Sequence, residues 1–336
     1  MTALAVVIVA YESAAHLPAT LAALEAQLSE SDELVVVDNA SSDSPESVVG
    51  ARGRVLRSEE NLGFAGGCNL GARATSAPVL FFLNPDAVPA PECLDALRAA
   101  AASHPGWGAW QALVTMAGGH QVNTSGGQTH WLGFGWSGRV GDPAETVGPE
   151  DRAVSFASGA ALCVRRGAWD AAGGFDEDYF MYGEDLDLSL RLRLAGWGVG
   201  LAAGAKAEHD YEFAKGTHKW FLLERNRWLT VLGVYPGALL ALTLPALLVS
   251  ELALLVVAAR GGWLGAKARA QLAVLRALPA ALRRRSAVQA SARVGAREFA
   301  ASLTADLDSP FLGSAAGIRP LAAAQAAYWR LVRGLL

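Results

Sequence analysis

The sequence has 336 residues, of which 52% are hydrophobic and 18% are charged, and this composition excludes an intrinsically disordered chain. Three scattered cysteines, without a close pair or a histidine-rich spacing, argue against a disulfide framework and against a structural zinc site. The net charge of −4 divides unevenly, at −13 for residues 1–259 and +9 for residues 260–336, so we expect the two parts to face different surroundings.

Short apolar runs alternate with helix-like segments in the N-terminal part of the chain. The apolar runs lie at 4–10, 34–37 and 79–83, and the helix-like segments lie at 14–28, 43–50, 66–75 and 91–102. This alternation is typical of βαβ units around a parallel sheet, in which ligands bind at the carboxyl ends of the strands. The polar residues that follow each run are therefore candidate site residues. The first run lacks the basic start and the length of a secretory signal, so we interpret it as a buried strand.

Two polar loops follow the early strands. Asp38 ends the second run, where its carboxylate could accept a hydrogen bond from a nucleotide base or could simply form a turn. The loop 61–69 carries Asn61 and Gly63 and leads into a helix, so its backbone amides could meet a diphosphate. This loop is neither a P-loop nor a dinucleotide fingerprint, because it lacks the Gly-Lys-Ser/Thr ending and does not follow the first strand.

The third run ends in Asn84-Pro85-Asp86, which sets an amide and a carboxylate on one short extended segment. Such a pair suits Mg²⁺ or Mn²⁺ shared with phosphate oxygens, because hard cations prefer oxygen ligands. A simple turn at the end of the strand is the alternative. Far along the chain, His209 is either an ordinary hydrogen-bonded histidine or a further metal ligand.

Residues 104–157 show little periodicity, and we expect loops and short antiparallel strands there. A strand at 160–165, a glycine turn at 173–174 and a helix over 184–195, closed by Gly196, follow. Three carboxylates stand at the start of that helix: Glu184, Asp185 and Asp187. Asp187 is spaced to pair with Arg191 and is interpreted as structural, whereas one of Glu184 and Asp185 is available for proton abstraction.

From 229 to 259 the sequence is apolar except for two prolines and Glu251. These 31 residues would span about 46 Å as one helix, longer than a bilayer core of about 30 Å but too short for two full crossings. We expect a kinked or re-entrant pair of helices with both ends on the inner side, since basic residues flank both ends. A buried helix pair covering the sheet is the alternative. Before the run, Arg225 and Asn226 could hold a phosphate of the donor or of a lipid acceptor, or Arg225 could be membrane-flank charge.

The tail from 260 to 336 is rich in arginine. Arg269, Arg276 and Arg283 recur every seven residues, which predicts an interfacial amphipathic helix that Pro279 would kink. No aromatic residues interleave with these arginines in the manner of a nucleic-acid groove, so anionic lipid is the expected partner and nucleic acid is not. An ordinary solvated face is the alternative.

The ordered set of these motifs resembles family 2 glycosyltransferases, and in particular their rhamnosyltransferase-like branch, over residues 3–230. The segments that carry the resemblance are 9–11 (Val-Ala-Tyr), 37–41 (Val-Asp-Asn-Ala-Ser), 61–64 (Asn-Leu-Gly-Phe), 84–86 (Asn-Pro-Asp), 183–187 (Gly-Glu-Asp-Leu-Asp) and 224–227 (Glu-Arg-Asn-Arg). No single segment is decisive, whereas their order is. The motif at Asn84 departs from the double-aspartate form of the family, which leaves Asp86 as the main anionic metal ligand.

The resemblance implies an α/β chain of the GT-A fold, a mixed sheet with flanking helices, that inverts the anomeric centre. It implies Tyr11 and Asp38 near the nucleotide base, and Asn61 and Gly63 along the donor. It also implies Asp86 and His209 on a divalent metal, and Asp185 as the catalytic base. We expect Glu184 on the acceptor or phosphate side.

We therefore expect a GT-A domain over 1–228, apolar membrane-associated helices over 229–259 and a basic amphipathic tail over 260–336. The donor would be a nucleotide-diphospho-sugar, with rhamnose a family-level choice. The acceptor would be a lipid-linked glycan of cell-envelope polysaccharide synthesis, at the cytoplasmic face of the inner membrane. A sugar-phosphate nucleotidyltransferase and a non-catalytic membrane scaffold that binds nucleotide sugar remain as alternatives.

Overall fold

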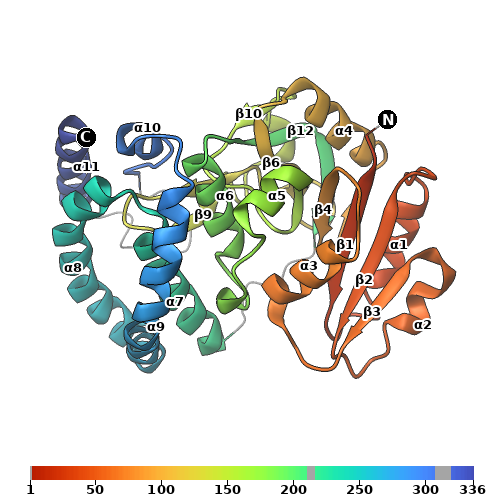
Figure 1. Cartoon of the computed structure of the whole chain (residues 1–336), viewed down its shortest axis with the longest axis horizontal. Coiled ribbons are helices and arrows are strands. Elements are labelled where there is room, and N and C mark those ends of the chain that lie inside the picture. Colours follow the sequence, from red (N-terminus) through yellow and green to blue (C-terminus); the bar gives the residue numbers. More distant parts are fainter. Residues whose placement is uncertain (1, 210–215, 307–318) are drawn as a thin grey trace. The chain divides into compact units, whose positions relative to one another are not determined.

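The computed structural model describes residues 2–209, 216–306 and 319–336. The chain divides into two compact units. The first unit comprises the described residues of Met1–Gly127, Ser137–Leu192 and Trp197–Tyr211, and the second comprises those of Gln128–Trp136, Arg193–Gly196 and Glu212–Leu336. Figure 1 shows the strands gathered in the first unit and long helices in the second.

The first unit is built on a mixed sheet with the strand order β10-β12-β6-β11-β4-β1-β2-β3. Its strands are β1 (Leu4–Ala10), β2 (Glu33–Asn39), β3 (Arg54–Ser58), β4 (Val79–Leu83), β6 (Trp107–Thr115), β10 (Arg152–Ala153), β11 (Ala161–Arg165) and β12 (Gly198–His209). The short strands β5 (Ala87–Pro89) and β7 (Val122–Thr124) pair with β12 and β6. The four strands β4-β1-β2-β3 are parallel, as the alternation of runs and helices predicts, and β11 is antiparallel to β4 and β6.

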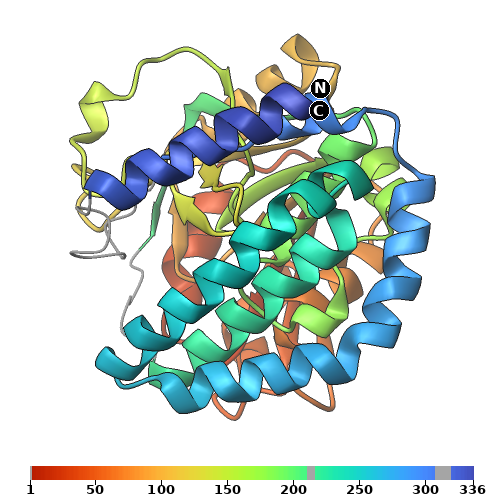
Figure 2. The same cartoon turned by 90° about the vertical axis from the view of Figure 1, so that its left-hand side faces the viewer.

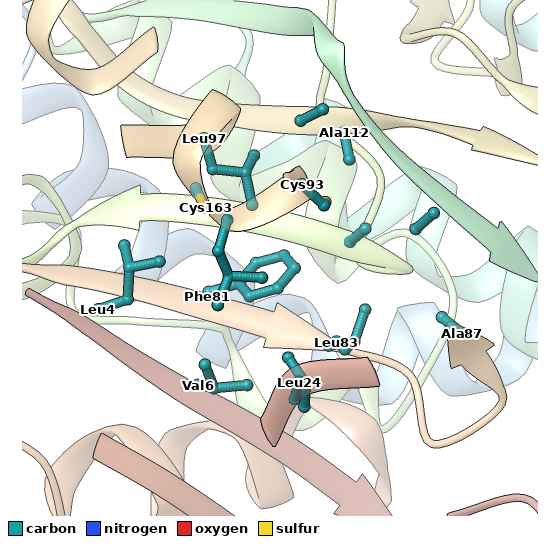
Figure 3. Packing of buried hydrophobic residues seen from close by; sticks show 14 of the residues in the cluster. Leu4, Val6, Leu24, Phe81, Leu83, Ala87, Cys93, Leu97, Ala112 and Cys163 are labelled. Atoms are coloured by element: carbon teal, nitrogen blue, oxygen red, sulfur yellow. The ribbon is translucent and has the colours of Figure 1, made fainter. Parts of the chain in front are cut away.

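Helices cover both faces of this sheet because alternate side chains of each central strand point to opposite faces. On one face, leucines of α1 (Leu17–Glu25) and α4 (Cys93–Ser103) pack against Leu4, Val6 and Phe81, as Figure 3 shows in part. On the other face, α3 (Gly63–Arg73), α5 (Arg166–Ala172) and α6 (Glu184–Leu194) pack against the remaining strand residues. The short helical segments are α2 (Glu46–Val49), η1 (Gly50–Arg52), η2 (Ala144–Thr146) and η3 (Glu177–Tyr179). This three-layer arrangement confirms the α/β class.

The expectation of only loops and short strands over 104–157 was wrong for its first part. The nine-residue strand β6 lies there, parallel to β12 and antiparallel to β11. Eight of its nine residues are buried, so the strand lacks the alternation of polar and apolar residues that marks a half-exposed strand. The later part does contain short strands, among them β8 (Gly127–Thr129) paired with β9 (Gly135–Ser137).

The second unit contains the helices α7 (Gly216–Val234), α8 (Gly237–Arg260), α9 (Leu264–Ala290), α10 (Ala296–Ala300) and α11 (Arg319–Leu335), and Figure 2 views it face-on. The apolar run begins inside α7, so the boundary expected at 228 and 229 falls within a helix. The run turns at Tyr235 and Pro236 and continues as α8, which agrees with two helices rather than one. Pro279 lies inside α9, and Figure 2 shows this helix bent.

Among the described residues, α8 is the one helix that is long and apolar enough to cross a membrane. Only 11% of its most apolar window is buried, so α8 is not the buried core helix that the alternative interpretation requires.

Candidate active site

The carboxyl end of β2 holds Asp38 inside a network of hydrogen bonds. Its side chain is fully buried, accepts from the backbone N–H of Ser41 at 2.9 Å and forms an ion pair with Arg57 of β3. The Arg57 guanidinium also donates to the Ser41 carbonyl at 3.2 Å and stays half exposed. Sequence reasoning missed Arg57, whose only signal is a position on the parallel strand beside Asp38. Tyr11 follows β1 and is 51% exposed, so its ring is free to stack on a flat ligand.

The loop before α3 is held by its own side chains and by the neighbouring loop. Asn39 accepts from the N–H of Leu62 at 2.9 Å and donates to Asn61 at 3.0 Å, while Asn61 accepts from the N–H of Gly63 at 2.9 Å. The N–H of Ala65 donates to the Phe180 carbonyl at 3.1 Å. Three amides around the start of α3 thus already have protein acceptors, and Asn61 and Gly63 help to fix the shape of the loop.

Gly63 is required at its position for two reasons. Its φ of +70° lies in the left-handed region, and a Cβ built there would stand 2.3 Å from the Phe180 carbonyl oxygen. We expect Gly63→Ala to destabilise the first unit by about 1–3 kcal/mol and to weaken donor binding, because the loop must shift. Urea unfolding and donor titration measure both effects.

The matched control is Gly167→Ala in α5, where φ is not positive and no atom lies within 4 Å of the new Cβ. That change should be neutral or stabilising by up to about 1 kcal/mol, since alanine is the better helix former. Equal stability of the two variants would contradict the steric argument at Gly63.

The metal ligands expected from the sequence, Asp86 and His209, lie together although 123 positions separate them. Strand β5, directly after Asp86, pairs antiparallel with the end of β12, and this register sets Ala87 opposite His209. The His209 Nε2 atom lies 3.0 Å from Asp86 Oδ1 and 3.2 Å from the Asn84 amide nitrogen. The His209 side chain is 3% exposed and that of Asp86 is 27% exposed, so the carboxylate is the group that faces solvent.

The side chains of Asp86, His209 and Asn84 fit a cation that is shared with a substrate. Two ligands at right angles around Mg²⁺ stand about 3.0 Å apart, which is close to the separation of Asp86 Oδ1 and His209 Nε2. Within the described ranges no three His, Cys, Asp or Glu residues are grouped to hold a metal. These two side chains, with the Asn84 amide beside them, would therefore hold a cation only together with other ligands such as phosphate oxygens.

Helix α6 begins with the two carboxylates that were candidates for proton abstraction, and they differ in surroundings. Asp185 is partly buried and accepts from the N–H of Gly159 at 2.9 Å and of Leu186 at 2.7 Å. Burial raises its pKa, against the opposing effect of these N–H donors. Glu184 is 5% exposed, and its Oε2 atom is buried without a hydrogen-bond partner among the described residues.

Burial raises the pKa of Glu184 well above its ordinary value, and the neighbouring charges of Asp185 and Asp187 raise it further. Burial and the neighbouring carboxylates thus favour the protonated form of Glu184. Asp187 is fully buried and binds Arg191 at 2.7 Å and the Tyr179 hydroxyl at 2.9 Å, which confirms its structural role. Asp185, which is partly exposed, therefore remains the candidate base.

Two consecutive residues, Gly159 and Ala160, bind Asp185 and Asn84 respectively. The N–H of Gly159 donates to Asp185, and the carbonyl of Ala160 accepts from the N–H of Asn84 at 3.0 Å. A Cβ at Gly159 would stand 3.0 Å from the Phe64 ring, so the loop before α3 also approaches this point. Asp185 and Asn84 are therefore both hydrogen-bonded to one segment, Gly159-Ala160, which leads into β11.

The residues Arg225 and Asn226, expected to bind acceptor or phosphate, lie in α7 of the second unit. Arg225 is partly exposed and donates to the Asn226 side chain at 2.9 Å, and Asn226 is 2% exposed. Their neighbour Arg227 is buried, with bonds to Glu224, Glu251 and the Leu132 carbonyl, so it is part of an internal ion cluster. Sequence reasoning missed this cluster, because Glu251 and Leu132 lie outside α7 and the local sequence does not reveal them.

Two family models match this chain. The model described as glycosyl transferase family 2 matches residues 5–121, and the model described as glycosyl transferase family group 2 matches residues 79–283, more than half of the chain. The chain belongs to glycosyl transferase family 2. It is therefore a glycosyltransferase, and the rhamnosyltransferase-like resemblance seen in its motifs is confirmed.

Among members of family 2, the N-acetylglucosaminyl-diphospho-decaprenol L-rhamnosyltransferase of Mycobacterium tuberculosis is 34% identical over 209 residues, covering 55% of this chain and 68% of that protein. Solved structures share the fold at lower identity. GalNAc-T7 with UDP, GalNAc and Mn²⁺ has a TM-score of 0.58 at 16% identity; the match covers 70% of this chain and about half, 49%, of that one. S. aureus TarS with UDP has a TM-score of 0.52 at 16% identity and covers 98% of this chain and 90% of its own. These likenesses confirm the GT-A fold.

Proposed function

We propose that the chain transfers a rhamnosyl residue, with inversion, from a nucleotide-diphosphate donor to an acceptor sugar carried on a polyprenyl diphosphate in cell-envelope glycan synthesis. The geometric support is the segment Gly159-Ala160, because it is hydrogen-bonded both to the candidate base Asp185 and to Asn84, which lies beside Asp86 and His209. The relative from Mycobacterium tuberculosis, named for rhamnosyl transfer to such a lipid-linked N-acetylglucosamine, supports the choice of sugar and acceptor.

In the proposed reaction, Asp185 removes the proton of the acceptor hydroxyl as that oxygen bonds to the anomeric carbon. The bond from the anomeric carbon to the donor diphosphate breaks on the opposite face, so the configuration inverts. The raised pKa of Asp185 makes it a stronger base than an ordinary aspartate while the carboxylate remains available. Tyr11 and the Asp38–Arg57 pair would meet the nucleotide base, which places the leaving diphosphate toward Asp86.

Asp86 and His209 would hold a Mg²⁺ or Mn²⁺ ion, which when bound neutralises charge on the departing diphosphate. We expect Asp86→Asn to raise the Mn²⁺ concentration for half-maximal activity at least about tenfold, because among the described residues Asp86 is the one that brings a carboxylate to the site. Conversely, Asn84→Asp should lower that concentration, since it adds a second one. Transfer rates measured over a Mn²⁺ series check both changes, and an unchanged requirement in Asp86→Asn would remove Asp86 from the metal site.

The deciding experiment is a screen of nucleotide sugars, with and without Mn²⁺, against a short-chain polyprenyl-diphosphate N-acetylglucosamine. Donor-dependent release of nucleoside diphosphate together with a glycosylated lipid supports the proposal. Release of pyrophosphate from a nucleoside triphosphate would instead identify a nucleotidyltransferase. Donor binding without any product would identify a scaffold.

We also propose that the chain works at the cytoplasmic face of the inner membrane, against anionic lipid. The lipid-linked substrate in the name of the relative and the apolar helix α8 support membrane association. The charge of +9 over residues 260–336 supports anionic lipid. Nucleotide sugars are made in the cytoplasm, so the donor substrate is present on that side of the membrane.

A further inference from the structure

The outward face of α8 is apolar along its whole length. Between its first residue and Arg260, Glu251 is the only ionisable residue. The helix packs inward through a narrow stripe of Leu239, Thr243, Leu247 and Ala258. Its exposed side chains include Leu244, Leu248, Val249, Leu252, Leu255, Val256 and Val257, with exposures from 40% to 67%. A continuous apolar face of this extent marks an interaction surface, since single exposed leucines are common but such rows are not.

Helix α9 presents a leucine row and an arginine row side by side. At 100° per residue, the exposed Leu264, Leu272 and Leu275 fall within a sector of about 80°, and Arg269 and Arg276 fall in the sector next to it. The buried residues of the same stretch, Ala266, Ala270 and Val274, occupy the remaining side. Leucines at the level of acyl chains with arginines at the level of phosphates are typical of a helix that lies in a membrane interface.

An internal ion cluster ties the middle of α8 to its neighbours. Glu251 accepts from Lys267 at 2.7 Å and from Gln271 at 2.8 Å, both on α9, and it pairs with Arg227 of α7. Lys267 also binds Glu224 of α7 at 2.6 Å and is fully buried. The cluster holds two acidic and two basic groups, so its formal charges balance.

Helix α8 could cross a bilayer or lie along its interface, and the ion cluster distinguishes these two arrangements. Its 24 residues measure about 36 Å, enough to cross a bilayer core of about 30 Å. Crossing would either break the ion pairs of Glu251 inside hydrocarbon or carry α7 and the arginine-rich α9 into the bilayer with it, and both are strongly unfavourable.

We infer that the second unit docks on an anionic lipid bilayer through the outer face of α8 and the leucine and arginine rows of α9, and that α8 lies along the interface without crossing it. The choice of an anionic lipid surface follows from the arginine row, which matches its charge. The inference deepens the proposed function, because it says how the enzyme meets a membrane-borne acceptor, but the docking itself needs no catalysis.

Flotation of the full chain with lipid vesicles, without donor or acceptor, tests this surface. We expect the protein to float with vesicles that contain phosphatidylglycerol and to bind phosphatidylcholine vesicles at least about tenfold less. The pair Leu248→Gln and Leu252→Gln should weaken binding to the anionic vesicles at least about tenfold, since it removes two inserted side chains. The pair Arg269→Gln and Arg276→Gln should abolish most of the preference for anionic lipid.

Matched controls and a second readout keep the test decisive. Arg54→Gln with Arg73→Gln removes the same charge from exposed positions of the first unit, and it should leave vesicle binding unchanged. Alkaline carbonate should extract the bound protein; protein that stays with the lipid would show a crossing helix and overturn the inference. Equal binding to both kinds of vesicle would overturn it as well. So would a dimer of the chain that the leucine substitutions dissociate, because the apolar face would then bind a second copy. Loss of sugar transfer with vesicle binding intact would instead count only against the proposed function.

Discussion

Replacing Asp185 with asparagine should lower turnover at least about a hundredfold while donor affinity stays within about threefold. The amide is nearly isosteric and its oxygen can still accept a hydrogen bond from the N–H of Gly159, so the contact with the segment that leads into β11 is kept. It cannot take a proton from the acceptor hydroxyl. Single-turnover transfer and donor titration on the same preparation separate the two effects.

Two further variants make the Asp185 experiment specific. Asp170→Asn, at an exposed position of α5, changes the same functional group away from the site and should leave turnover unchanged. Burial favours the protonated form of Glu184, which the amide of Glu184→Gln resembles, so this variant should retain most of the activity. If Glu184→Gln lost turnover and Asp185→Asn kept it, the assignment of the base would be reversed.

The pH profile follows from the raised pKa of Asp185. The reaction needs the carboxylate, so turnover should rise with pH on the acid side, with a midpoint above the ordinary aspartate pKa of 3.8. A midpoint at or below that value would contradict the direction of the shift. This acid limb should be missing from the residual activity of Asp185→Asn.

The parallel strands and the motif residues could be predicted because each is a local pattern. Asp38, Asn84 and Asp185 all stand at the end of an apolar run or the start of a helix, where sequence reasoning looks for polar groups. The closeness of Asp86 and His209 had a different origin. It depends on the pairing of β5 with β12, and the only hint in the sequence was the order of motifs shared with family 2.

The parts that sequence reasoning missed are those whose partners are distant and whose own pattern is ordinary. Arg57 is an arginine on a short strand, and only the neighbouring strand makes it a partner of Asp38. Glu251 appeared as an interruption of an apolar run, and Arg227 as one residue of the Glu-Arg-Asn-Arg motif before it. The structure joins them across 24 positions, because the turn at Tyr235 and Pro236 folds α8 back toward α7.

The ion cluster around Lys267 yields the largest expected effect on stability. In Lys267→Met the apolar stem is kept, but Glu224 and Glu251 lose a shared cation, and only Arg227 remains to balance one buried and one partly buried carboxylate. Removing one partner of a buried ion pair destabilises by about 3–5 kcal/mol, because the remaining charge is left desolvated. Urea unfolding should show this loss, whereas Lys206→Met, at an exposed position of β12, should change stability by less than about 0.5 kcal/mol.

Because the charges of the cluster balance, removing one carboxylate should partly restore the stability that Lys267→Met loses. Adding Glu224→Gln to Lys267→Met leaves Glu251 and Arg227 as one balanced pair, so the double variant should be more stable than Lys267→Met by at least about 1 kcal/mol. If the two substitutions destabilised additively, the four groups would not act as one neutral cluster, and the argument that Glu251 keeps α8 from crossing a membrane would lose its basis.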